Sequence, residues 1–190
     1  GVQTCALPIC IKNTGDMPGY YGSGVLEILD GNNNAFITKN YVGSSPYGIL
    51  LQPGESAYIR ESIWDKQLIE TRPSGYSYSP TVKTYGSKYY QVPCDAQFYY
   101  SEDSKYDNDI FITFTNSTDE LLHDFSFVAS IYDQNDTLVY VYSTSYSNIG
   151  LYPGSTITMM FDIYSNMCQY YINHGITPTR IEGYVYISGD

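Results

Sequence analysis

The clearest structural signal in the chain is Phe125-Ser126-Phe127-Val128-Ala129-Ser130-Ile131-Tyr132, which leads into Asp133-Gln134-Asn135-Asp136. The first run alternates in character and is rich in aromatic and β-branched residues, a pattern typical of a half-buried β-strand. The second run consists of residues that reverse the chain readily. Together they predict a strand that ends in a hairpin turn.

The same signal occurs twice along the chain. Residues 11–39 align without a gap on residues 114–142. Identical pairs include Asn13 with Asn116, Asp16 with Asp119, Val25 with Val128, Ile28 with Ile131, Asp30 with Asp133 and Asn32 with Asn135. Later, Leu51-Gln52-Pro53-Gly54 falls on Leu151-Tyr152-Pro153-Gly154, and Tyr76-Ser77-Tyr78 on Tyr184-Val185-Tyr186. Such self-similarity predicts two copies of one module of about 100 residues.

The fold class follows from the spacing of turns within each copy. Turn-forming groups such as Asp30-Gly31-Asn32-Asn33-Asn34, Pro53-Gly54 and Pro153-Gly154 interrupt short apolar runs. No window of about 11 residues has a convincing helical period, and Ser165–His174 is expected to hold one helical turn at best. The pattern predicts an all-β protein made of two tandem β-sandwiches.

The repeat also predicts the domain boundaries. We expect one sandwich over residues 10–85 and another over residues 86–190. In the second copy, a Tyr-bearing strand at Ala96–Ser101 precedes the strand at Ile110–Thr115, and its counterpart in the first copy would fall before residue 1. The first copy is therefore expected to lack its N-terminal strand.

Residues 1–9, Gly1-Val2-Gln3-Thr4-Cys5-Ala6-Leu7-Pro8-Ile9, differ in composition from the Tyr-, Asn- and Ser-rich remainder. They resemble the conceptual translation of a common sequencing-library adapter. We expect them to be non-native and set them apart from the fold. The alternative is an ordinary N-terminal β-strand.

Composition excludes several classes of partner. The 190 residues include 9 Lys+Arg and 20 Asp+Glu, for a formal charge of −11. So few cations cannot supply the basic surface that nucleic acids or anionic membranes require. No apolar run reaches the length of a transmembrane helix, so no membrane insertion of this region is expected.

Residues 127–139 and the later Leu151-Tyr152-Pro153-Gly154 resemble the FxLYD-type extracellular domain family of Gram-positive bacteria. In that family an aliphatic residue, Tyr and Asp lead into a hairpin, as do Ile131-Tyr132-Asp133 here. The family's Phe is Ala129 in this copy, and Leu29 replaces the Tyr in the other copy. The resemblance implies immunoglobulin-like or fibronectin-III-like sandwiches on secreted or cell-surface bacterial proteins, usually without a defined activity.

Catalytic signals are sparse. Nucleophilic catalysis with a histidine base would have to use His123 or His174, the only two histidines, and both are expected to be solvated. The motifs of serine hydrolases, zinc proteases, dithiol redox proteins and P-loop proteins do not occur. We expect a protein that is not an enzyme and needs no cofactor.

Acidic residues provide the candidates for a metal site. The weak Ca²⁺ candidates are Glu102, Asp103, Asp107 and Asp109, in the loop between the first two strands of the second copy, because Ca²⁺ prefers several oxygen ligands. A solvated acidic loop is the simpler interpretation, and paired carboxylates of a glycosidase are a third. The D-x-N-x-N pattern of Asp30, Asn32 and Asn34 is interpreted as a β-turn, as is its match Asp133, Asn135 and Thr137.

Two of the four cysteines could form a disulfide. Cys5 lies in the adapter-like segment and Cys10 adjoins it, which leaves Cys94 and Cys168. An extracellular location would allow these two to pair. The alternative is a pair of free thiols.

The 23 tyrosines are the remaining unusual feature. Neighbouring tyrosines on a strand point to opposite faces, so one ring of each pair should be exposed. The candidate ligand-facing aromatics are Tyr99, Tyr100, Tyr170 and Tyr171.

From these features we expect a non-catalytic spacer or interaction module, whose partner is an unknown protein or glycan at the cell surface. The alternatives are a carbohydrate-binding module that uses exposed Tyr rings, a Tyr-rich surface that binds nothing in particular, and a glycoside hydrolase fragment.

Overall fold

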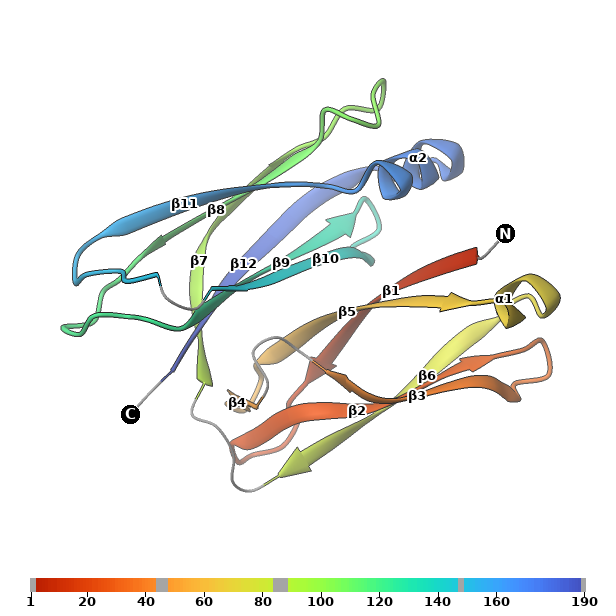
Figure 1. Cartoon of the computed structure of the whole chain (residues 1–190), viewed down its shortest axis with the longest axis horizontal. Helices are drawn as coiled ribbons and strands as arrows, with labels where there is room; N and C mark the ends of the chain where they lie inside the picture. The colour runs from red at the N-terminus through yellow and green to blue at the C-terminus, as the bar shows by residue number, and fades with distance from the viewer. Residues whose placement is uncertain (1–2, 44–47, 84–88, 147–148, 189–190) are drawn as a thin grey trace. The chain divides into compact units, whose positions relative to one another are not determined.

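The computed structural model describes residues 3–43, 48–83, 89–146 and 149–188. The chain divides into two compact units, residues 1–89 and residues 90–190, which are called unit 1 and unit 2 below. Strands account for most of the described residues, and two short helices accompany them (Figure 1). The expectation of a β-rich fold is confirmed, although the protein is mostly β and not all-β.

Unit 1 is built from two groups of paired strands. β1 and β5 pair in antiparallel register along their whole length. β2 pairs antiparallel with β3, β4 and β6. The elements are β1 (Gln3–Lys12), β2 (Gly19–Leu29), β3 (Ala35–Gly43), β4 (Ile49–Leu51), β5 (Ser56–Asp65), α1 (Gln67–Glu70) and β6 (Gly75–Lys83).

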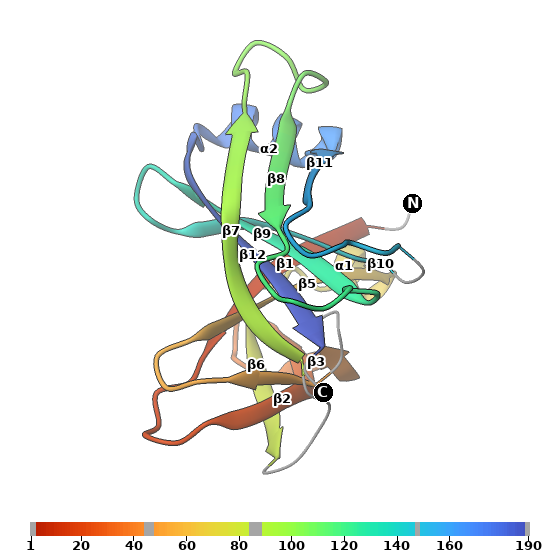
Figure 2. The ribbon, with the colours of Figure 1, turned by 90° about the vertical axis from the view of Figure 1, so that its left-hand side faces the viewer.

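Unit 2 repeats this order with one additional strand at its start, and an isolated bridge between Leu122 and Leu151 takes the place of β4. β9 lies between β10 and β12, and β8 lies between β7 and β11. β7 runs beside β8 in Figure 2 and also pairs with β12, so it joins the two groups. The elements are β7 (Tyr89–Tyr99), β8 (Asp109–Thr115), β9 (Phe125–Asp133), β10 (Leu138–Tyr146), β11 (Thr156–Asp162), α2 (Ser165–His174) and β12 (Pro178–Ser188).

Burial along the strands shows where sequence alternation is a reliable guide. In β2, Leu26 and Ile28 are buried while Glu27 between them is partly exposed, as alternation predicts. In β9, every residue from Phe125 to Ile131 is buried. The half-buried strand expected there is therefore wrong: β9 is a central strand, and its polar residue Ser126 bonds to Ser145 at 2.7 Å.

α2 is longer than the sequence pattern suggests. One turn at best was expected over Ser165–His174, but all ten residues are helical. Cys168 and Tyr171 lie one turn apart and are both buried, and Gly175 ends the helix with a left-handed φ of 63°. Two buried positions are too few to produce a visible helical period in the sequence. The helix forms because its buried face packs against the rest of unit 2. Neither helix in the described residues is long and apolar enough to cross a membrane.

The strand register corrects one part of the repeat. Leu26 pairs with Tyr78, and its counterpart Ala129 pairs with Gly183. Tyr78 is thus equivalent to Gly183, and Tyr76 to Ile181, so the sequence match of Tyr76-Ser77-Tyr78 to Tyr184-Val185-Tyr186 is wrong by three positions. That match paired residues that face opposite sides of their sheets.

The adapter-like segment lies largely within a strand. Residues 1–2 are outside the described part of the chain, whereas Gln3–Ile9 form most of β1 and pair with Ile59–Asp65 of β5. No strand of unit 1 in the described residues occupies the place that β7 takes in unit 2.

Candidate functional site

The residues shared by the two units were the first candidates for a site, and the hairpin aspartates are the clearest pair. Oδ1 of Asp30 accepts hydrogen bonds from two backbone N–H groups of its own turn, at 2.8 and 2.9 Å. Asp133 does the same, at 2.9 Å for both. These bonds lower the pKa of both carboxyls, chiefly through the N–H of Asn34 for Asp30 and of Thr137 for Asp133. Both carboxylates are therefore used to hold a turn.

Asn13 and Asn116 form the second shared feature. Nδ2 of Asn116 donates to the carbonyl oxygens of Glu120 and Leu151, both at 2.8 Å, and its Oδ1 accepts from the N–H of Thr118 at 3.0 Å. Asn13 makes the equivalent bonds in unit 1. Gly54 and Gly154 donate to the carbonyl oxygens of Asn13 and Asn116, respectively. These contacts join two loops in each unit.

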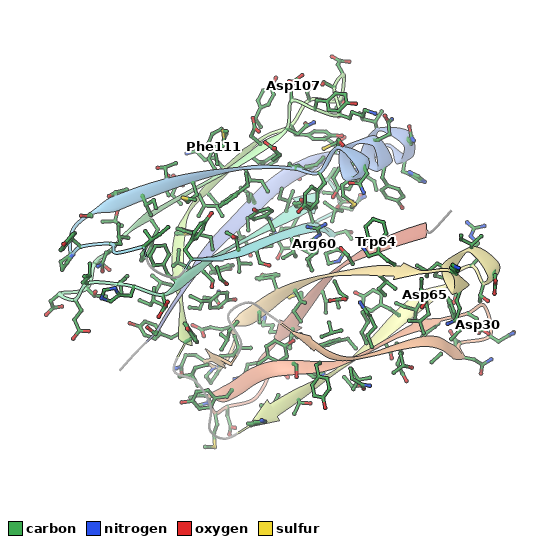
Figure 3. The ribbon with its side chains drawn as sticks, viewed as in Figure 1. Asp30, Arg60, Trp64, Asp65, Asp107 and Phe111 are labelled. Atoms are coloured by element: carbon green, nitrogen blue, oxygen red, sulfur yellow. The ribbon has the colours of Figure 1, made fainter. Side chains whose placement is uncertain are left out.

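The predicted acidic cluster lies in the loop between β7 and β8, where Figure 3 shows Asp107. Asn108 is buried and orders this loop, since its Nδ2 donates to Ser104 O and its Oδ1 accepts from Ser101 N, both at 2.7 Å. Oε1 of Glu102 accepts from Thr177 Oγ1 at 2.9 Å. Asn108 is a structural residue that the sequence reasoning missed.

The four acidic candidates of this loop do not surround a common point. Glu102, Asp103 and Asp107 are exposed, and Asp109 begins β8 opposite Asp162 of β11. In the described part of the chain, no group of three or more His, Cys, Asp or Glu side chains is placed to hold a metal ion. The Ca²⁺ assignment therefore stays a prediction without a ligand set.

The four candidate tyrosines divide between surface and interior. Tyr99 is 57% exposed and Tyr170 is 49% exposed, whereas Tyr171 is buried and its hydroxyl donates to Val139 O at 2.8 Å. Tyr100 meets Tyr171 edge-on, with the ring centroids 6.4 Å apart. Tyr171 in turn meets Tyr170 edge-on at 6.3 Å. The fold thus brings Tyr100 against the distant pair Tyr170 and Tyr171, as a row of three rings with an exposed end.

The histidines take different positions. His174 stacks on Tyr170, with the ring centroids 4.0 Å apart, and its Nδ1 lies 2.8 Å from Tyr170 O. His123 is exposed. His174 thus extends the row of rings at its exposed end.

Cys94 and Cys168 are free thiols in this structure, and the disulfide between them stays a prediction. Cys168 is buried on α2, and Cys94 is partly buried on β7. Burial raises the pKa of Cys94 to about 12 and that of Cys168 to about 11. Both are therefore protonated and poorly nucleophilic at neutral pH.

Arg180 is the centre of a charged cluster that the sequence pattern did not reveal. Its guanidinium lies over the Tyr132 ring, 3.8 Å from the centroid, and donates to Asp136 and Glu182. Asp136 reaches it from the hairpin after β9, so the contact depends on two strands that are adjacent only in the fold. The hydrogen bond to Asp136 is the main cause that raises the pKa of Arg180.

A pocket in unit 1 also went unpredicted. It has a volume of about 300 Å³ and opens between the end of β1 and the end of β6. Ile11 and Lys12 border it from β1, Leu51 from β4, and Pro80 and Val82 from β6. Its lining is mainly apolar.

Comparison with known proteins leaves the family of the chain open. No family model matches the chain, and no curated protein matches it. Among solved structures, it is distantly similar to a "putative secreted protein" from Parabacteroides distasonis, with 13% identity and a TM-score of 0.30. The match covers 99% of this chain and 67% of the other. A likeness at this level carries no argument about function.

Proposed function

We propose that the chain is a non-catalytic region of a secreted or cell-surface bacterial protein, built from two tandem immunoglobulin-like units of the FxLYD type. It acts as a spacer or interaction module whose partner is a protein or glycan outside the cell.

This proposal is supported by the structural role of the residues that the two units share. Asn13 and Asn116, Asp30 and Asp133, and the Pro-Gly turns are the clearest matches between the two copies. Each of them holds a loop or a hairpin by hydrogen bonds to the backbone. A duplicated catalytic module would share reactive groups at one site, whereas these units share scaffolding.

An assay for glycoside hydrolysis tests the non-catalytic role. The full chain is incubated with chromogenic glycosides and with cell-wall and plant polysaccharides, beside Glu102→Gln and Asp107→Asn variants. We expect no product from any of the three proteins. Steady hydrolysis that either substitution abolishes would overturn the proposal.

Carbohydrate binding is the second candidate function, and the exposed rings of Tyr99 and Tyr170 favour it. Exposed aromatic rings beside polar groups can stack on the apolar face of a sugar. On a glycan array, binding through these rings should weaken about tenfold in Tyr170→Ala. Tyr152→Ala removes a ring that is 68% exposed in the loop before β11 and serves as the matched control. Absence of binding to all glycans would dismiss this alternative.

A further inference from the structure

Two Asn-x-Ser/Thr sequences occur in the chain, Asn116-Ser117-Thr118 and Asn135-Asp136-Thr137. In exported proteins this three-residue sequence is the acceptor for N-linked glycosylation when the middle residue is not proline and the asparagine lies at the surface. Both copies of the sequence satisfy the first condition. Only the fold distinguishes the two asparagines by the second.

Asn116 cannot serve as the acceptor in the folded chain. It is fully buried, and its Nδ2 donates to the carbonyl oxygens of Glu120 and Leu151, both at 2.8 Å. The nitrogen of a glycosylated asparagine bears the sugar and keeps one hydrogen, so at least one of these two bonds would be lost. The carbonyl oxygen left without a partner would be a buried unsatisfied acceptor, which destabilises the fold.

Asn135 lies in the hairpin between β9 and β10, where residues 134–137 are all exposed. The turn is held by backbone N–H groups. Those of Asn135 and Thr137 both donate to Oδ1 of Asp133 at 2.9 Å, and that of Asp136 donates to Asp133 O at 3.0 Å. A sugar on Nδ2 of Asn135 therefore leaves these bonds intact.

The residues on both sides of Asn135 are tied to other parts of unit 2. Oε1 of Gln134 accepts from the N–H of Thr177 at 2.8 Å. Asp136 accepts from the guanidinium of Arg180 on β12. These contacts fix the turn while Asn135 between them stays exposed, so a transferase would find its acceptor at a defined place on the surface.

The two side chains of the acceptor sequence that matter for recognition lie beside one carboxylate. Hydrogen bonds from the side chains of Asn135 and Thr137 are among the causes that lower the pKa of Asp133. The acceptor amide and the hydroxyl two residues later are therefore on the same side of the turn. Because Asn135 is exposed, its amide can exchange this contact for one with a transferase.

The hairpin of unit 1 has the same turn without the acceptor sequence. Asn32 corresponds to Asn135 and is also exposed. Oδ1 of Asp30 accepts from the N–H groups of Asn32 and Asn34, at 2.8 and 2.9 Å. Asn34 stands where unit 2 has Thr137, so the hydroxyl is missing. The chain thus contains its own matched comparison.

We infer that Asn135 is the acceptor for an N-linked oligosaccharide, which an oligosaccharyltransferase delivers from a lipid pyrophosphate carrier. A bond forms between Nδ2 of Asn135 and the anomeric carbon of the first sugar, and the bond from that carbon to the pyrophosphate oxygen breaks. The lipid pyrophosphate leaves, and one amide proton passes to water. The inference rests on the proposed function for one point, the exported location of the chain.

The test uses the folded full chain, a purified single-subunit bacterial oligosaccharyltransferase and its lipid-pyrophosphate-linked oligosaccharide. Because the components are purified, the result does not depend on where the chain is located in a cell. Intact-protein mass spectrometry counts the oligosaccharides on each chain, and peptide mapping locates them. We expect one oligosaccharide, at Asn135, and none at Asn116.

Four substitutions separate the acceptor sequence from the turn. Asn135→Gln and Thr137→Val should each abolish modification, whereas Thr137→Ser keeps the hydroxyl and should retain it. Asn34→Thr gives the hairpin of unit 1 the missing hydroxyl and should add a second oligosaccharide, at Asn32. All of these side chains are exposed and the turns are held by backbone N–H groups, so unchanged circular dichroism is expected for every variant.

A free peptide copied from Ile131–Val139 controls for the transferase. Modification of this peptide but not of the folded chain would overturn the inference, because the hairpin would then be closed to the enzyme. Failure of the peptide itself, transfer to Asn116 in place of Asn135, or undiminished transfer to the Thr137→Val chain would each overturn it as well. None of these results bears on glycoside hydrolysis, so the inference can fail while the non-catalytic role stands.

Discussion

Replacement of Asn116 by alanine tests how the shared asparagines stabilise the two units. The Asn116 side chain is fully buried and takes part in four hydrogen bonds, two to carbonyl oxygens and two from Thr118. In Asn116→Ala, the carbonyl oxygens of Glu120 and Leu151 and the N–H of Thr118 lose their partner. A buried hydrogen bond contributes about 1 kcal/mol, so we expect the free energy of unfolding to fall by about 3 kcal/mol.

Asn13→Ala is the matched comparison, because Asn13 makes three of the four equivalent bonds in a more exposed setting. Its bonds to Met17 O and from the N–H of Gly15 lie at the surface, at 2.9 and 3.0 Å. Water can replace these two partners, which leaves mainly the bond to Leu51 O. We therefore expect a loss of about 1 kcal/mol.

Urea unfolding followed by far-ultraviolet circular dichroism measures both losses. Hydrogen exchange at Leu122 and Leu151, which bond to each other at 3.1 and 2.9 Å, reports the local effect in unit 2. The single tryptophan, Trp64, lies on β5 (Figure 3) and reports unit 1 by fluorescence. Ser117→Ala, at an exposed neighbour of Asn116, should change stability by less than about 0.5 kcal/mol.

A second variant separates loss of the bonds from loss of side-chain volume. Asn116→Asp keeps the volume and the acceptor for Thr118, but it turns both donations to carbonyl oxygens into repulsions. It should destabilise unit 2 at least as much as Asn116→Ala. Equal costs for Asn13→Ala and Asn116→Ala, or a near-neutral Asn116→Asp, would refute the argument from burial.

Three further outcomes are expected. Asp133 has a folded-state pKa below its ordinary value of 3.8, so its stabilisation is complete above that pH and is lost as the pH falls through the folded pKa. Asp133→Asn should flatten acid unfolding below pH 3.8, as followed by circular dichroism. Gly154→Ala should cost about 1 kcal/mol in urea unfolding because φ is +75° there, whereas Gly31→Ala, with open space and no such φ, should be neutral. Cys94 and Cys168 should react with iodoacetamide only after denaturation, and peptide mass mapping will measure this reaction. If the two residues resist alkylation in denaturant until a reductant is added, they form a disulfide.

Features that depend on residues close in sequence were predictable. The strands of unit 1 follow from alternation, as Leu26 and Ile28 show, and the hairpins follow from Asp30 and Asp133, which bond to N–H groups two and four positions ahead. Short-range chemistry of this kind has few alternative partners.

Features that depend on packing were less predictable. α2 has only two buried positions, Cys168 and Tyr171, and so shows no clear period in the sequence. The final strand was aligned by its tyrosines, yet backbone pairing places Tyr78 opposite Leu26 and Gly183 opposite Ala129. Tyr78 has space because it lies over Gly24 and reaches Val42 of β3, whereas a side chain at Gly183 would collide with Cys94 and Ala96 of β7.

The sequence by itself determined the β-rich class, the duplication and the acidic charge, because each is written in local pattern or in composition. Only the tertiary structure decided which tyrosines are buried and where the acidic residues lie. Tyr171 is buried in contact with Tyr100 and Val139, whereas its neighbour Tyr170 is 49% exposed. Those contacts come from distant parts of the chain, and no pattern around Tyr171 records them.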